Sequence, residues 1–150
     1  LPLISDRSFV VRTRFDQREG DEGVLWAIGD PSGGMVMYVE SGRLNFHYNG
    51  FGDAVSLPPF DLDTGSHEAV LEYEALGGRT GRGRVLMDGQ EQVGWTELTP
   101  TLEFGIFEGI DVGLDRNGPV LWDLYERHGA FGYSGSVKDV RVEPGDRATG

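Results

Sequence analysis

Two glutamates in one stretch of this chain could perform acid–base chemistry. Residues 66–75 read SHEAVLEYEA, in which Glu72 and Glu74 stand two positions apart. On a strand, residues two apart lie about 6–7 Å from one another on the same face, which is near the ~5–5.5 Å between the carboxylates of retaining glycoside hydrolases. The same alternation places three apolar side chains on the opposite face, which is typical of a strand with a solvated acidic side. The solvated strand is the simpler interpretation, and a glycosidase is the last of the alternatives.

A glycine- and arginine-rich segment, residues 77–83, is expected to form a loop that could hold an anion. It contains Arg79 and Arg82, and guanidinium groups bind oxyanions such as sulfate through paired hydrogen bonds. The segment lacks the Gly-Lys-Ser/Thr ending of a phosphate-binding P-loop. Its arginines would otherwise pair with neighbouring acids, so a sulfated ligand is one of two interpretations.

Three oxygen-bearing side chains could contribute to a calcium site. Asp111, Asp115 and Asn117 supply two carboxylates and one amide oxygen, whereas calcium takes about 6–8 oxygens. The set is incomplete, so the sequence requires no cofactor and leaves calcium as an open alternative.

No pattern of a reactive nucleophile is present. The chain has no cysteine, which excludes disulfides, thiolate metal sites and a cysteine nucleophile. Residues 132–136, GYSGS, end in serine where a nucleophile elbow has glycine. The chain has three histidines, His47, His67 and His128, and no two of them have the spacing of a metal-ligand pair. They are expected to be solvated or at the edge of the core. The chain by itself is therefore expected to have no catalytic residue.

Trp122 and Tyr125 are the aromatic candidates for ligand binding. They lie in an irregular segment after Pro119, and flat aromatic rings can stack on a sugar or contact a partner domain. Local packing of the segment is the alternative. Trp26, in contrast, is expected in the core because it lies in the middle of an apolar strand.

The elements that must position these residues are short strands joined by tight turns. Residues 22–49 predict a three-stranded meander, broken at 30–34 and again at 41–42. The chain contains 24 glycines, which favours many turns. We expect one domain, an all-β, two-sheet antiparallel β-sandwich of the jelly-roll type. Residues 1–7 would be a linker and 144–150 a tail, and further strands are expected at 8–15, 66–75, 84–88, 90–98, 102–107 and 134–142.

The net charge of −12 limits the partners of the chain. It results from 25 acidic and 13 basic residues, and such a field repels nucleic acid and anionic lipid. No apolar run approaches the ~20 residues of a membrane-spanning helix. We therefore expect neither nucleic acid nor membrane as a partner, while the sequence leaves open whether the protein is cytoplasmic or exported.

An ordered set of short pieces carries a resemblance to a known family. The pieces include Gly33-Gly34, Gly42-Arg43-Leu44, Asp88-Gly89, Asp111-Val112-Gly113 and Ser134-Gly135. Together they resemble the C-terminal β-sandwich domain of large bacterial arylsulfatases, a concanavalin-like, laminin-G-like jelly roll. The resemblance covers about residues 8–143.

This resemblance implies a non-catalytic accessory domain within a longer polypeptide, whose partner would be a catalytic sulfatase domain that hydrolyses sulfate esters. Such catalytic domains carry a Cys/Ser-x-Pro-x-Arg motif, and the nearest match here, residues 56–60, has Phe60 in place of arginine. An independent carbohydrate-binding, lectin-like module that uses Trp122 and Tyr125 is the alternative, with either a carbohydrate or a sulfated ligand.

Overall fold

The computed structural model describes residues 7–30, 33–50, 53–77, 80–98, 110–112 and 132–147, and none of these residues is helical. It follows that none belongs to a helix long and apolar enough to cross a membrane. The strands in chain order are β1 (Arg7–Gln17), β2 (Gly23–Asp30), β3 (Gly33–Glu40), β4 (Arg43–Gly50), β5 (Asp53–Ser56), β6 (Phe60–Asp61), β7 (Gly65–Gly77), β8 (Thr80–Met87), β9 (Gln90–Glu97), β10 (Ile110–Val112) and β11 (Ser136–Arg147).

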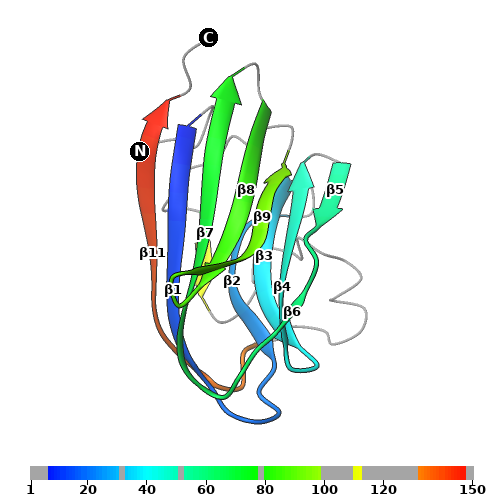
Figure 1. The fold of residues 1–150 in the computed structure, drawn as a ribbon, viewed down its shortest axis with the longest axis vertical. Helices are drawn as coiled ribbons and strands as arrows, with labels where there is room; N and C mark the ends of the chain where they lie inside the picture. The colour runs from blue at the N-terminus through cyan, green and yellow to red at the C-terminus, as the bar shows by residue number, and fades with distance from the viewer. Residues whose placement is uncertain are drawn as a thin grey trace.

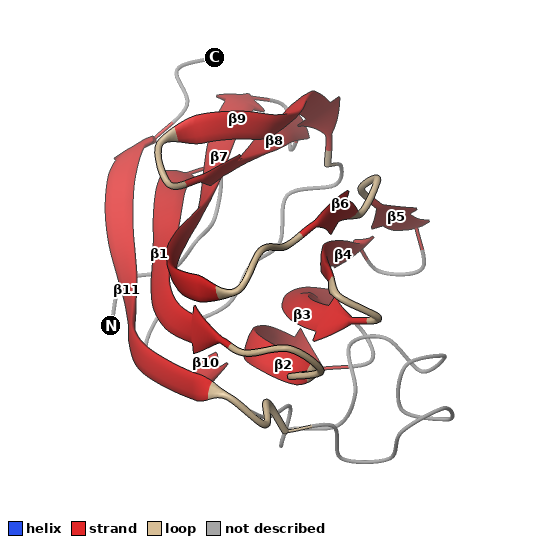
Figure 2. Ribbon diagram, turned by 60° about the horizontal axis from the view of Figure 1, so that its bottom comes forward, coloured by secondary structure: helices blue, strands red, loops and turns tan. Residues whose placement is uncertain are grey.

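The strands form two antiparallel sheets. The front sheet, which faces the viewer in Figure 1, has the order β11-β1-β7-β8-β9. The back sheet has the order β10-β2-β3-β4-β5, with β6 also paired to β4. Figure 2 shows the sheets as two curved layers with the chain crossing between them. The predicted two-sheet β-sandwich of the jelly-roll type is confirmed.

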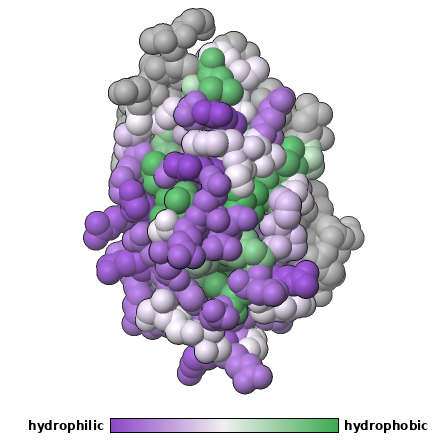
Figure 3. All heavy atoms as spheres, in the orientation of Figure 1, coloured by the Kyte–Doolittle hydropathy of each residue, from purple (hydrophilic) through white to green (hydrophobic). Residues whose placement is uncertain are grey.

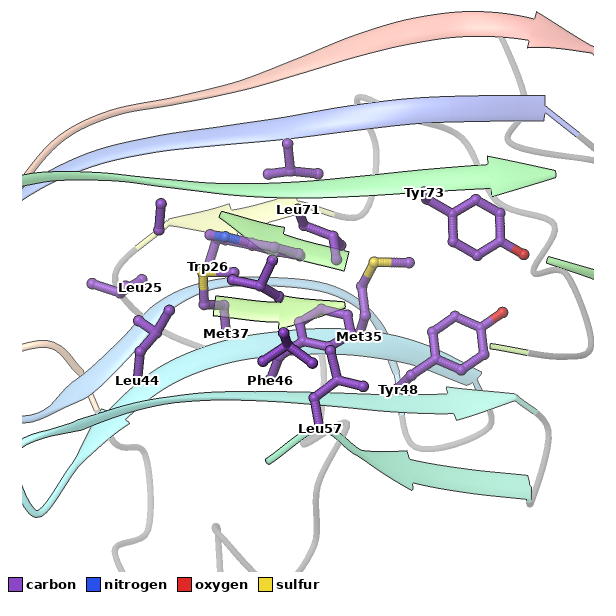
Figure 4. Packing of buried hydrophobic residues seen from close by; sticks show 14 of the residues in the cluster. Leu25, Trp26, Met35, Met37, Leu44, Phe46, Tyr48, Leu57, Leu71 and Tyr73 are labelled. Atoms are coloured by element: carbon purple, nitrogen blue, oxygen red, sulfur yellow. The ribbon is translucent and has the colours of Figure 1, made fainter. Parts of the chain in front are cut away.

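The hydrophobic core fills the space between the sheets (Figure 4). Tyr73 of β7 and Tyr48 of β4 face one another across it, with ring centroids 6.3 Å apart and nearly parallel planes. Phe9 stacks on Tyr73 from within the front sheet at 5.0 Å. Stacked rings contribute about 0.5–1.5 kcal/mol per pair beyond their buried area, so this column of rings helps to hold the two layers together. The other large, fully buried side chains are Trp26, Phe15, Leu25, Ile28, Met35, Met37, Leu44, Leu71 and Leu98.

A β-bulge at Leu25 allows two consecutive residues to enter the core. Val24 pairs with Tyr38, but Trp26 pairs with the adjacent Met37, which leaves Leu25 as the extra residue. Leu25 and Trp26 are both 0% exposed. Strict alternation would turn one of these side chains away from the core, so the bulge lets β2 bury both.

Two hairpins have the turns that the sequence predicts. Ser41 and Gly42 join β3 to β4 with φ of 54° and 71°, and Asp88 and Gly89 join β8 to β9 with φ of 52° and 83°. Positive φ at both central residues defines the type I′ turn, whose twist matches the right-handed twist of the flanking strands.

The expectation of a loop over residues 77–83 is wrong for Gly77 and for residues 80–83, which belong to strands. Strand β7 extends to Gly77 and β8 begins at Thr80, and the two pair with one another at that point. Gly81 belongs to β8, and a Cβ atom there would overlap the hydroxyl of Tyr73. The glycine therefore makes room for a core side chain; it does not end the strand.

The last strand is longer than expected. Strand β11 continues to Arg147, so residues 144–147 belong to a strand, and the expected tail at 144–150 is corrected for that part. Pro144 pairs with Phe9 in an edge position of the described sheet, where a missing N–H is tolerated. Strand β11 has a β-bulge at Lys138, which lies between the residues Asp139 and Val137 that pair with β1. The expected strand at 102–107 lies outside the described residues.

Candidate binding site

The outward face of the front sheet carries cross-strand ion pairs. Figure 3 shows hydrophilic side chains spread over this face, with apolar atoms in smaller areas between them. Glu72 of β7 contacts Arg84 of β8 at 2.8 Å, and Glu74 contacts Arg82 at 3.0 Å. Both carboxylates of the glycosidase alternative are therefore bound to guanidinium groups, as expected for a solvated acidic face.

Arg82 also contacts an aromatic ring. Its guanidinium lies 4.4 Å from the centroid of Trp95, and that of Arg84 lies 4.7 Å from the same ring. Guanidinium groups at this distance are attracted by the face of the ring. Arg82 thus pairs with a neighbouring acid, as the alternative to anion binding predicted. Arg79, the other arginine suggested for anion binding, lies outside the described residues.

A hollow of about 410 Å³ lies where β1, β7, β11 and the β8–β9 turn meet. We call it the β1–β7 hollow. It combines three carboxylates and three basic side chains with one hydroxyl and one aromatic residue. Its lining residues are Arg14, Phe15, Asp16, Ser66, His67, Glu68, Asp88 and Lys138.

Strand pairing brings one wall of the hollow together. Asp16 lies opposite Ser66 in the β1–β7 ladder, and the Ser66 hydroxyl donates to its carboxylate at 2.7 Å. Lys138, the bulge residue of β11, reaches the other Asp16 oxygen at 3.1 Å. The pKa of Asp16 is lowered, first by the hydrogen bond from Ser66 and then by Lys138. Asp16 is therefore an ionised acceptor in a fixed position.

His67 links two connections beside the hollow. Its Nδ1 lies 2.6 Å from Oδ2 of Asp88, and its Nε2 lies 2.7 Å from the carbonyl oxygen of Asp63. Both neighbours are acceptors, so both ring nitrogens must donate, which requires the imidazolium form. Burial by itself lowers the pKa of His67, but the hydrogen bonds to Asp88 and Asp63 outweigh it and raise the pKa. With both nitrogens bonded, His67 is a structural cation; it has no free nitrogen to act as a base.

Asp88 is held from two directions. Its Oδ1 accepts a hydrogen bond from the backbone N–H of Glu68 at 2.8 Å, while Oδ2 faces His67. Burial raises the pKa of Asp88, yet these two donors outweigh it and lower the pKa. Both oxygens of the Asp88 carboxylate are thus hydrogen-bonded within the protein.

Glu68 has the least engaged carboxylate of the hollow. Its ion pair within the described part of the chain is with Arg12, at 3.8 Å, which is too long for a hydrogen bond. Glu68 and Arg14 also line an adjoining hollow of about 200 Å³. Arg14 donates from Nε and Nη2 to Asp139, the shortest contact being 2.6 Å. The two hollows therefore share the open acceptor of Glu68 and the fixed guanidinium of Arg14.

Most residues that the sequence suggested for ligand binding cannot be placed in this site. Trp122 and Tyr125 lie outside the described residues, as do Asp115 and Asn117 of the calcium alternative. Asp111 lies in β10, paired with Ala27 of β2. In the described part of the chain, no three acidic or histidine residues gather closely enough to hold a metal ion. The calcium site remains a prediction.

The other two histidines do not belong to the hollow. His47 is buried in the back sheet, where its Nδ1 lies 2.8 Å from the Ser56 hydroxyl, and burial lowers its pKa. His128 lies outside the described residues. The sequence predicted the strand at 8–15 that carries Arg14, but it did not predict the hollow, because the walls of the hollow come from strands that are far apart in the chain.

No protein-family model and no curated protein sequence matches this chain. Solved structures do match. Domains LG4-5 of the mouse laminin α1 chain align with a TM-score of 0.65 at 14% identity, covering 98% of this chain and 40% of that chain. A bifunctional GH43-CE protein of Bacteroides eggerthii aligns with a TM-score of 0.53 at 12% identity, covering 91% of this chain and 18% of that chain.

Two carbohydrate-binding modules align over most of both chains. The CBM66 module from Bacillus subtilis has a TM-score of 0.50 at 13% identity, and covers 95% of this chain and 77% of its own. The CBM40 module of the Ruminococcus gnavus IT-sialidase has a TM-score of 0.52 at 13% identity, and covers 93% of this chain and 76% of its own. These likenesses establish a laminin-G-like, concanavalin-like β-sandwich fold.

Proposed function

We propose that this chain is a non-catalytic, lectin-like module that binds carbohydrate. The observation that carries the proposal is the extent of the structural likeness. This chain covers about three quarters of each of the two carbohydrate-binding modules, whereas it covers much smaller shares of the laminin and bifunctional chains. The β1–β7 hollow adds a suitable surface, because it offers donors and acceptors side by side.

The same proposal assigns no chemistry to the chain. Glu72 and Glu74 are bound by Arg84 and Arg82, and both ring nitrogens of His67 are occupied. A glycosidase would need one of its carboxylic acids protonated and free to donate to the leaving group. These contacts favour binding over hydrolysis.

A second candidate is the accessory domain of an arylsulfatase. It is supported by the ordered sequence pieces and by the sandwich fold that the resemblance implies. In that case the sulfate ester would be hydrolysed by a separate domain of the same polypeptide. An upstream Cys/Ser-x-Pro-x-Arg motif in the same reading frame would favour this candidate.

The test is binding of the purified 150-residue chain to an immobilised glycan array, with heat-denatured chain as the control. We expect dose-dependent binding to one group of related glycans by the folded chain only. A parallel assay with an aryl sulfate and with β-glucan should detect no hydrolysis. Absence of binding to every glycan would contradict the lectin-like proposal, and hydrolysis would contradict its non-catalytic part.

Calcium and the aromatic candidates can be tested on the same array. Binding that is lost with a chelator and restored by calcium would support the loop site at Asp111, Asp115 and Asn117. Binding that survives replacement of both Trp122 and Tyr125 by alanine would remove them as the sugar platform.

A further inference from the structure

We infer that the β1–β7 hollow binds an uncharged saccharide through neighbouring hydroxyl groups. Glu68 and Asp16 would accept hydrogen bonds from the sugar, while Arg14 and Lys138 would donate. This inference rests on the proposed carbohydrate-binding function, and assigns to it a site and a ligand class.

The hydrogen-bonding groups of the hollow have capacity to spare. Lys138 carries three donor hydrogens, and its ammonium contacts Asp16 at 3.1 Å. Arg14 uses Nε and Nη2 on Asp139. The side chains of Lys138 and Arg14 are 55% and 56% exposed, so their remaining hydrogens can be reached by a ligand.

The acceptors lie directly beside these donors. Glu68 is opposite Arg14 in the β1–β7 ladder, and Asp16 is two residues further along β1 on the same face. A sugar hydroxyl both donates and accepts a hydrogen bond. Adjacent hydroxyls can therefore each bridge a carboxylate and a cation, whereas a group that only donates or only accepts would satisfy half of the site.

The charges of the hollow favour a neutral ligand. Its three carboxylates are matched by Arg14, Lys138 and the cationic His67. A sulfated sugar would bring negative charge next to Glu68 and Asp16, in a chain whose net charge is −12. A cationic sugar would meet Arg14 and Lys138. Only an uncharged ligand avoids repulsion from both the carboxylates and the basic side chains.

The hollow is also preorganised. Asp16 is fixed by Ser66 and Lys138, and Asp88 is fixed by His67 and the backbone of Glu68. Groups that are already ordered lose little entropy when a ligand binds. The Phe15 side chain is 1% exposed, so recognition would come from hydrogen bonds with little ring stacking.

The experiment compares two glutamate variants of one strand. Glu68→Gln removes the charge of the open acceptor, and Glu72→Gln makes the same chemical change on the same face of β7, where Arg84 holds the carboxylate outside the hollow. Affinity electrophoresis in mannan, β-glucan, galactan and inulin measures binding to neutral polysaccharides, and heparin is the sulfated probe. Lys138→Met is a second, independent change in the hollow.

We expect the wild-type chain to be retarded by at least one neutral polysaccharide and not by heparin. Lys138→Met removes a charged donor and should weaken that binding by about tenfold or more. Glu68→Gln keeps an oxygen that accepts but loses its charge, so it should weaken the binding by about fivefold. Glu72→Gln should bind as the wild type does. If all three variants bound as tightly as the wild type, the proposed site would be overturned, but the proposed function would stand. Retardation by heparin alone would overturn the ligand class, and retardation by no probe, together with a blank array, would remove the proposed function as well.

Discussion

His67 ties the connection that contains Asp63 to the β8–β9 turn that contains Asp88, and its replacement should change how stability depends on pH. In the folded protein both ring nitrogens donate, to Asp88 at 2.6 Å and to the Asp63 carbonyl at 2.7 Å. The His67 side chain is 11% exposed and that of Asp88 is 49% exposed, so water screens the interaction in part. Glutamine at this position stays neutral at every pH and removes the titration.

The direction of the stability change with pH follows from the raised pKa of His67, for which the effect of burial is outweighed by the hydrogen bonds to Asp88 and Asp63. Hydrogen bonds that involve a charged group contribute about 1.5–3 kcal/mol each. Because the folded-state pKa of His67 lies above its ordinary value of 6.5, this stabilisation is fully present below the unfolded pKa. It is lost as the pH rises through the folded pKa, with a slope of at most about 1.4 kcal/mol per pH unit.

The assay is urea denaturation, followed by tryptophan fluorescence, from about pH 5.5 to about pH 9. The wild type should lose stability toward the alkaline end, and His67→Gln should be less stable at low pH and lack that loss. His47→Gln is the control, because burial lowers the pKa of His47. Its titration removes stability as the pH falls from about 6.5, so removing it should change the curve in the opposite direction.

The carboxylates of Asp16 and Asp139 stay ionised across this pH range. The pKa values of Asp16 and Asp139 are lowered from 3.8 by hydrogen bonds from Ser66 and Arg14, respectively. Parallel curves of unfolding free energy against pH for the wild type and His67→Gln would refute the doubly bonded imidazolium. So would an increase in wild-type stability, relative to the variant, toward alkaline pH.

Two further predictions concern packing. Leu71→Ala should destabilise the protein by about 2–5 kcal/mol, because Leu71 is 0% exposed. Leu76→Ala on the same strand should have little effect, because Leu76 is 51% exposed. Equal urea midpoints for the two variants would contradict the assigned strand faces. Gly81→Ala should lower the melting temperature because its Cβ would overlap the Tyr73 hydroxyl, while Gly94→Ala has a nearest neighbour at 3.8 Å and should be tolerated. A Gly81→Ala variant as stable as Gly94→Ala would show that β8 and β7 are not packed in this way.

The local structure of the strands was predictable from the sequence, because side-chain direction alternates with a period of two. The pattern around Leu71 assigned the buried and solvated faces of β7, and Trp26 was recognised as a core residue. The turns at Asp88-Gly89 and Ser41-Gly42 were recognisable for another local reason, since a type I′ turn depends on the φ preferences of its own residues.

The extents of some strands were not predictable, because they depend on contacts with other strands. Gly81 was interpreted as a loop signal, but pairing with β7 keeps it in a strand, and the hydroxyl of Tyr73 occupies the space where a side chain would lie. Leu25 and Trp26 both face the core only because β2 bulges against β3. In each case burial of apolar area outweighed a local preference.

The sequence by itself determined that this is an all-β chain with amphipathic strands, tight hairpins and no thiol chemistry. Only the tertiary structure decided which polar residues meet. Asp16 and Lys138 are far apart in the chain, yet the pairing of β1 with β11 and the bulge at Lys138 place them 3.1 Å apart. Local patterns specify the face on which a side chain lies, but the neighbour of each strand is chosen by burial of the whole core, and the β1–β7 hollow is a consequence of that choice.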